Sequence, residues 1–142
     1  MKPETSYGNS RFDFYVETPD KKIFIEVKGV TLELDNVVLF PDAPSERAVK
    51  HVEELTEAAA NGYETYVLFV IQMQDVNYFV PNRVMQSAFA EALIRATEAG
   101  VHILAYDCSV EPDSMEIRNS VEVRLGEDEI FAKLPITHPS SF

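Results

Sequence analysis

Cysteine, basic side chains and long apolar runs are all scarce in this chain of 142 residues. The single cysteine, Cys108, has no second cysteine for an internal disulfide, and no Cys/His spacing suits a zinc site. We expect it to be a structural residue at the end of a strand. No stretch approaches the roughly 18 apolar residues that a membrane helix needs, and Met1–Glu4 has no apolar signal region. These absences predict a soluble, cytosolic protein with no membrane association.

Basic residues are outnumbered two to one: 12 lysines and arginines face 24 aspartates and glutamates, for a formal net charge of −12. Affinity for a nucleic-acid backbone comes from basic side chains that displace counterions, so tight DNA binding by this chain alone is not expected. The charge is uneven, however. Residues 21–50 are nearly neutral, and the acidic excess lies further on, in Glu53, Glu54, Glu57 and Glu127–Glu129. A phosphate could therefore approach a site in the first third of the chain.

Two alternating segments near the N-terminus predict a β-hairpin. Apolar and polar residues alternate along Arg11–Glu17 and again along Ile23–Lys28, which is the period of a half-buried strand. Thr18–Lys21 between them has good turn chemistry, with proline at the second position. A turn centred between residues 19 and 20 pairs Phe14 with Ile25. A slip of one residue would place every apolar residue opposite a polar one, so the sequence favours this register, with the apolar residues on the core face.

The same register places Asp13 directly opposite Glu26, with Lys28 two residues along. Opposed side chains share a face, with Cβ atoms about 5 Å apart, so two carboxylates converge. Such a pair can hold a cation that keeps most of its waters, and the cation can polarise a phosphate and activate water. The alternative is an acid pair on a solvated face, eased by Arg11 and Lys28. Asp followed by Glu-x-Lys on the next strand resembles the signature of the PD-(D/E)XK nuclease superfamily.

Four further motifs occur in order at short spacings, namely Tyr7–Phe14, Glu26–Leu32, Phe40–Ala43 and Lys50–Leu55. Together they resemble the sugar fermentation stimulation protein (SfsA) family, specifically its C-terminal, nuclease-like half. The resemblance runs from about residue 4 to about residue 125. It implies an α/β fold with a PD-(D/E)XK restriction-endonuclease-like core, in which helices flank a mixed central sheet. It also implies an association with DNA.

The resemblance implies roles for individual residues. Asp13, Glu26 and Lys28 match the catalytic motif, with Asp13 and Glu26 as ligands of Mg²⁺ or Mn²⁺. Glu4 matches an acidic residue just before the family's Tyr-Gly pair. The family's N-terminal half, an oligonucleotide-binding-like barrel, has no counterpart in this sequence, so we expect a homodimer or a partner that supplies it. Residues 1–125 are expected to form the nuclease-like domain, and residues 126–142 an acidic, flexible tail.

Several other polar residues are candidates for the site. Arg47, Lys50 and His51 lie on neighbouring positions of an expected helix and, with Arg11, could contact DNA phosphates; the alternative is a solvated helix face. Asp42 could be a further acidic ligand. Alternatively, either Asp42 or Ser45 could be the N-cap of that helix. Gln72 is the residue at the end of an apolar strand, where its side chain could lie near the metal. His102 is interpreted as a structural histidine.

The remaining pattern predicts two helices and four further strands. The first helix spans Glu46–Asn61, stops at Gly62 and buries Ala48, Val52, Leu55 and Ala59. The second spans Val84–Ala99 with Met85 inward. Thr65–Ile71 is expected to be a central strand paired with Asn77–Val80, and the last two strands to be Val101–Tyr106 and Met115–Leu125.

The sequence therefore predicts a metal-binding, nuclease-like domain that is associated with DNA and hydrolyses phosphodiester bonds. The alternative is a non-catalytic, DNA-associated regulator of sugar (maltose) metabolism genes.

Overall fold

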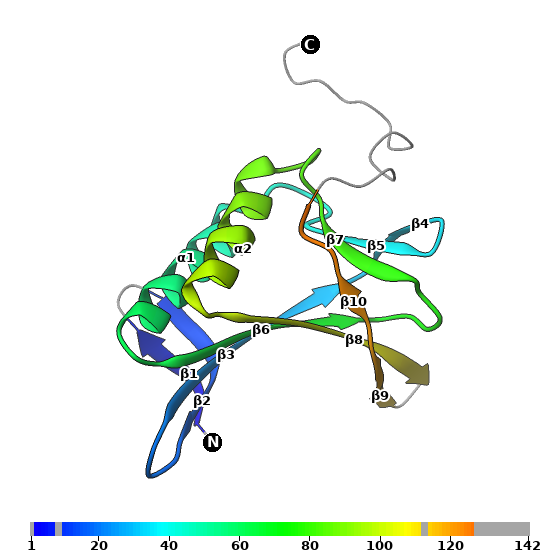
Figure 1. Ribbon diagram of the computed structural model, residues 1–142. Coiled ribbons are helices and arrows are strands. Elements are labelled where there is room, and N and C mark those ends of the chain that lie inside the picture. The colour runs from blue at the N-terminus through cyan, green and yellow to red at the C-terminus, as the bar shows by residue number, and fades with distance from the viewer. Residues whose placement is uncertain (1, 8–9, 112–113, 127–142) are drawn as a thin grey trace.

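Within residues 2–7, 10–111 and 114–126, which the computed structural model describes, ten strands and two helices follow one another (Figure 1). The strands are β1 (Lys2–Tyr7), β2 (Ser10–Glu17), β3 (Lys22–Val30), β4 (Leu32–Leu34), β5 (Val37–Phe40), β6 (Glu64–Ile71), β7 (Tyr78–Pro81), β8 (His102–Glu111), β9 (Ser114–Ser120) and β10 (Glu122–Val123). The helices are α1 (Glu46–Ala60) and α2 (Ser87–Ala99). Neither helix is long and apolar enough to cross a membrane, and the described residues contain no other candidate.

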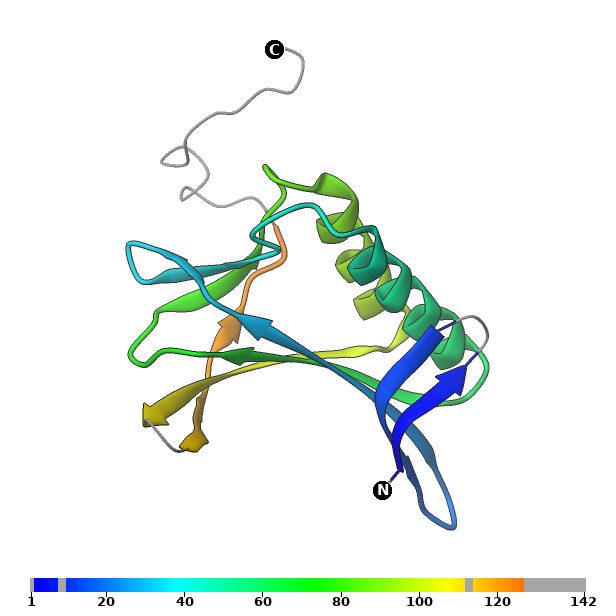
Figure 2. The ribbon, with the colours of Figure 1, turned by 180° about the vertical axis from the view of Figure 1, so that it is seen from behind.

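A mixed sheet of six strands organises the molecule, in the order β1-β2-β3-β6-β8-β9. Its three central strands, β3, β6 and β8, run parallel, and the outer strands pair antiparallel. Both helices lie over the same face of this sheet, as Figures 1 and 2 show from opposite sides. The expected α/β architecture, with helices against a mixed sheet, is therefore confirmed.

A second sheet has the order β10-β7-β5-β4 and continues from the end of β3 (Figure 2). The prediction that the segment around Tyr78 pairs with the central strand is wrong, because β7 pairs with β5 and β10 instead. Between β6 and β7 the chain passes from the first sheet to the second. At the two ends of this connection, Gln72 N donates to Val30 O at 3.0 Å and Asn77 N donates to Asn36 O at 2.7 Å. Buried Val37, Leu39 and Val80 then form a small core of their own.

The hairpin has the predicted register, with Phe14 opposite Ile25 and Val16 opposite Ile23. The predicted core face is wrong, however. Phe14 and Ile25 are only half-buried, whereas Tyr15 and Phe24 are buried with Glu26 on the other face. That face is the one that α1 covers, so a polar residue there becomes part of the interior.

The first helix begins and ends close to the predicted residues. Ser45, not Asp42, is the N-cap, and its Oγ accepts from Ala48 N at 3.1 Å. Gly62 follows the helix with φ of +93°, a conformation that glycine adopts without strain. The buried face of the helix differs from the prediction by one position at its end, because Ala58 is buried and Ala59 is only partly buried.

The second helix begins three residues later than predicted, at Ser87. Asn82 holds the preceding segment in a turn, because its Oδ1 accepts from Met85 N at 3.2 Å and its Nδ2 donates to Pro41 O at 3.0 Å. Met85 is therefore outside the helix and 41% exposed rather than inward.

The last strands also depart from the prediction. β8 runs on to Glu111, so Cys108 is buried within the strand and not at its end. The segment 115–125 divides into β9 and β10. His102 is exposed and stacks on Tyr66, with ring centroids 4.7 Å apart.

We expect Ser45→Ala to lower the free energy of unfolding by about 1 kcal/mol, because the N-cap bond to Ala48 is lost. Urea denaturation measures the change. Ser87→Ala is the matched control, since Ser87 is exposed and the α2 N-cap, Gln86, makes no side-chain cap bond. Equal losses in both variants would contradict the capping role.

Candidate active site

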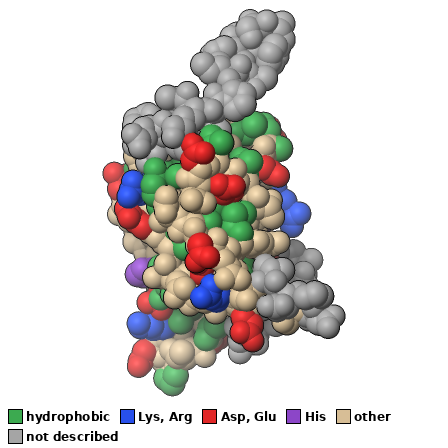
Figure 3. Space-filling model, turned by 90° about the vertical axis from the view of Figure 1, so that its right-hand side faces the viewer, with side chains coloured by type: hydrophobic (Ala, Val, Ile, Leu, Met, Phe, Trp, Pro, Cys, Tyr) green, Lys and Arg blue, Asp and Glu red, His purple; other side chains and the backbone are tan. Residues whose placement is uncertain are grey.

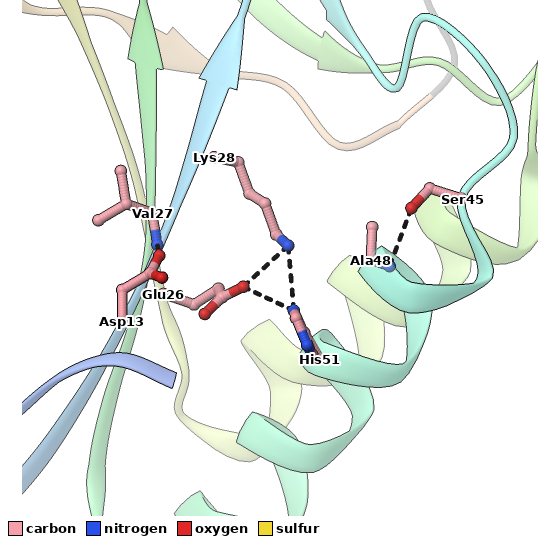
Figure 4. Close-up of polar contacts among 7 residues, drawn as sticks. All are labelled: Asp13, Glu26, Val27, Lys28, Ser45, Ala48 and His51. Carbon is pink, nitrogen blue, oxygen red and sulfur yellow. Dashed lines mark hydrogen bonds and ion pairs between the residues drawn. The ribbon is translucent and has the colours of Figure 1, made fainter. Parts of the chain in front are cut away.

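Glu26, Lys28 and His51 form a buried polar cluster between β3 and α1 (Figure 4). Lys28 Nζ lies 2.8 Å from Glu26 Oε2, and His51 Nδ1 lies 2.6 Å from the same oxygen. The two nitrogens are 3.1 Å apart. The side chain of Glu26 is only 4% exposed and that of His51 8%. One carboxylate oxygen therefore has two nitrogen partners.

The local sequence places these three side chains together. Residues two apart in a strand point to the same face, so Glu26 and Lys28 both face α1 from the interior of the sheet. His51 comes three residues after buried Ala48 and four before buried Leu55. The helical period therefore puts His51 on the inward face of α1, and this spacing is the signal that could have predicted its burial from the sequence.

Asp13 reaches the same stretch of β3 from β2. Its Oδ2 accepts a hydrogen bond from Val27 N at 2.8 Å (Figure 4). The described β2–β3 ladder ends at the pair of Phe14 with Ile25. Beyond that pair, the Asp13 carboxylate accepts a hydrogen bond from the β3 backbone. Asp13 and Glu26, which were predicted to be opposed, are therefore not a pair of the described ladder. Instead, the side chain of Asp13 is bound at Val27, the residue next to Glu26.

The two oxygens of Glu26 differ sharply in their surroundings. Oε2 contacts Lys28 and His51, whereas Oε1 is buried and has no hydrogen-bond partner among the described residues. A buried carboxylate oxygen without a partner is costly. A cation beside Oε1 would remove that cost.

Burial lowers the pKa of His51 below its ordinary value, and the nearby charge of Lys28 lowers it further. Glu26 opposes this effect through its charge and its hydrogen bond, but the net direction is downward. His51 is therefore a neutral imidazole at neutral pH, with one N–H donor and one acceptor nitrogen.

The other described candidate side chains lie outside this cluster, although the charge of Arg47 helps to lower the pKa of His51. Arg47 and Lys50 are exposed on α1, and Asp42 is exposed in the loop before it. Gln72 packs against Gly29, where an added Cβ would lie 2.8 Å from Gln72 Nε2. Gly29 faces away from the side of β3 that carries Lys28. Glu4 lies in β1 and Arg11 in β2, and only the backbone of these two residues is described.

Asp13 and Glu26 fit a hard cation that keeps its water. No three His, Cys, Asp or Glu side chains within the described ranges are grouped as a preformed metal cage. Mg²⁺ is commonly bound through one or two carboxylates and retains several waters. Two carboxylates on adjacent strands, with the buried Glu26 Oε1 lacking a protein partner, match that pattern.

A protein-family model described as "Sugar fermentation stimulation protein RE domain" matches residues 1–114. The chain belongs to the sugar fermentation stimulation protein (SfsA) family. A homologue from Ruminiclostridium cellulolyticum is 57% identical over 125 residues, covering 88% of this chain and 55% of the homologue. One from Desulfitobacterium hafniense strain Y51 is 57% identical over 127 residues, covering 89% and 56%. The chain thus spans about half the length of these curated relatives.

A solved structure confirms the fold of this SfsA-family chain. Pyrococcus furiosus SfsA, described in complex with Ca²⁺, superposes with a TM-score of 0.81 at 31% identity. The match covers 87% of this chain and 54% of that one. The chain therefore has the nuclease-like α/β fold predicted from its motifs.

In the metal-free protein, we expect the pKa of His51 to fall further in Glu26→Gln and to rise in Lys28→Met, because Glu26 raises it and Lys28 lowers it. NMR titration of the imidazole Cε1–H signal measures both shifts. Since the folded-state pKa of wild type is below 6.5, the unfolded chain takes up the proton first as the pH falls through that value. His51 therefore contributes a loss of stability below pH 6.5.

Shifts of the same sign in the two variants would contradict this description of the cluster. Glu53→Gln serves as the control for a change of charge on α1, because Glu53 is exposed and pairs with Arg95 at 3.4 Å.

Proposed function

We propose that this chain is a nuclease-like domain that binds a divalent cation, Mg²⁺ or Mn²⁺, at Asp13 and Glu26 and hydrolyses phosphodiester bonds in nucleic acid. The observation that carries the proposal is the buried Glu26 Oε1, which lacks a hydrogen-bond partner among the described residues while Lys28 lies beside the other oxygen.

The solved relative supports the binding of a divalent cation. Pyrococcus furiosus SfsA is described in complex with Ca²⁺. Ca²⁺ and Mg²⁺ both prefer oxygen ligands, and the oxygen ligands offered here are the two carboxylates. When bound, such a cation polarises a phosphate and lowers the pKa of a water molecule.

The chain's own residues supply position and charge. Asp13 is held by Val27 N, so its carboxylate has a fixed direction. Lys28 carries a positive charge in a setting where its side chain is only 13% exposed, and a partly buried charge acts strongly on a phosphate oxygen. Its ammonium can donate to the attacking water or to the oxygen on which negative charge develops.

The surface supports the expectation that this domain alone binds nucleic acid weakly. Arg47 and Lys50 are exposed on α1, the helix that also carries His51. On the face drawn in Figure 3, acidic and basic side chains are interspersed, and its described residues form no continuous basic surface. Since basic side chains provide backbone affinity, we propose that a second copy or the remaining half found in the longer relatives supplies it.

A second candidate function is a non-catalytic regulator associated with DNA. The contacts at 2.6 Å and 2.8 Å already compensate the charge of Glu26 without a cation. A protein that had lost catalysis could keep this cluster for stability alone. Metal binding and hydrolysis therefore decide between the two candidates.

The first test concerns the cation. We expect Mn²⁺ to raise the melting temperature of wild type, because a ligand at 100 times its Kd stabilises the native state by about 2.7 kcal/mol. Asp13→Asn and Glu26→Gln should abolish the shift, and Glu53→Gln should retain it. Asp13→Asn is the cleaner variant, because Glu26→Gln also removes the charge that pairs with Lys28. Equal Mn²⁺ shifts in wild type and Asp13→Asn would refute the site.

The second test concerns catalysis by Lys28. Lys28→Met keeps an unbranched apolar side chain and removes the ammonium group, so we expect hydrolysis of a labelled oligonucleotide to fall about 100-fold or more while the Mn²⁺ shift remains. Lys22→Met is the matched control, because Lys22 is exposed at the start of β3. Loss of both hydrolysis and the Mn²⁺ shift would make Lys28 a structural residue. Absence of hydrolysis by wild type would favour the regulator.

A further inference from the structure

The three contacts among Glu26, Lys28 and His51 cannot all be hydrogen bonds at once. Nδ1 of a neutral imidazole either carries a hydrogen and donates, or has a lone pair and accepts. It cannot donate to Glu26 Oε2 and accept from Lys28 Nζ together. The distances of 2.6 Å and 3.1 Å therefore pose a choice between two tautomers of His51.

The shorter distance decides the choice. Two heavy atoms at 2.6 Å need a hydrogen between them, since two lone pairs would repel at that separation. The Lys28 ammonium, 2.8 Å from the same Oε2, favours negative charge on that oxygen. The hydrogen therefore belongs to Nδ1 of His51. The 3.1 Å between the two nitrogens then follows from their shared acceptor.

Two donors on one oxygen fix the whole carboxylate. With Oε2 bound by His51 from α1 and by Lys28 from β3, the Glu26 side chain cannot rotate without breaking both bonds. Oε1 is thereby held in the position where it has no hydrogen-bond partner among the described residues. A fixed ligand oxygen binds a cation better than a rotating one, because less ordering is needed on binding.

We infer that His51 is a positioning residue: its Nδ1–H holds Glu26 Oε2 and thereby presents Oε1 to the cation. The cation part of this inference rests on the proposed function, whereas the hydrogen bond does not. The side chain of His51 is only 8% exposed. His51 therefore acts through Glu26 and does not make the phosphate contact that the sequence predicted for it. Arg47 and Lys50 on the outer surface of the same helix remain the candidates for phosphate contact.

The first measurement needs no metal. The tautomer of a histidine can be read from the ¹⁵N and ¹³C chemical shifts of its ring. We expect the Nδ1–H tautomer for His51 in wild type, with a downfield Nδ1–H signal, and the loss of that signal in Glu26→Ala. His102, exposed on the other side of the sheet, is the internal reference and should not respond. An Nε2–H tautomer for His51 in wild type would overturn the inference.

The second measurement uses two isosteric variants. The amide nitrogen of asparagine can occupy the place of Nδ1, whereas that of glutamine can occupy the place of Nε2. We therefore expect His51→Asn to bind Mn²⁺ nearly as well as wild type in calorimetry. His51→Gln should bind about 10- to 100-fold more weakly, as is typical when the partner of a metal ligand is removed. Melting temperatures of the metal-free variants show whether both fold.

The outcomes separate this inference from the proposed function. If wild type binds Mn²⁺ and the two His51 variants bind it equally, the positioning role is wrong and the metal site stands. If wild type does not bind Mn²⁺, the proposed function and the presentation of Oε1 fail together, even where the Nδ1–H tautomer is observed. Weaker binding by His51→Gln alone supports the inference.

Discussion

The burial of the Glu26 carboxylate is the constraint on which the rest of the site depends. A charged group that is 4% exposed is costly unless partners compensate it. Those partners come from its own strand, as Lys28, and from α1, as His51. Neither partner is in place until α1 docks on the sheet. The chemistry of the site and the packing of the helix are therefore parts of one arrangement.

The fold secures that arrangement from both sides. Ser45 caps α1, and Ala48 and Leu55, above and below His51 on the helix, are fully buried. β3 lies between β2 and β6, which pair with it from Lys22 to Ile25 and from Ile23 to Val30 respectively. Where β2 stops pairing, Asp13 takes over the contact with Val27. Where regular pairing ends, the carboxylate of Asp13 is thus bound at Val27, the residue that follows Glu26 in β3.

The sequence predicted what depends on neighbours along the chain. The hairpin register followed from turn residues and alternation, and the stop of α1 followed from Gly62, whereas the sequence left its N-cap open between Asp42 and Ser45. It misjudged what depends on distant elements. Which face of the hairpin is buried is decided by α1, about 20 residues on, because both faces carry apolar residues. The predicted partner strand of β7 was wrong for the same reason, because pairing with β5 and β10 leaves no pattern in the sequence of β7 itself. The assignment of Asp13, Glu26 and Lys28 to a catalytic site stays a prediction, and the burial of His51 was overlooked although its spacing indicated it.

Chemistry and affinity are separable in this molecule. The positive charge of Lys28 is engaged with Glu26 in the interior, so it adds little to the long-range attraction of a polyanion by an acidic chain with a net charge of −12. Attraction must come from exposed basic residues, of which α1 offers Arg47 and Lys50. The contacts of Glu26 with Lys28 and His51, and that of Asp13 with Val27, come from β2, β3 and α1 alone. The charge of Glu26 is therefore compensated within β3 and α1, whereas the exposed basic side chains of α1 lie outside that cluster.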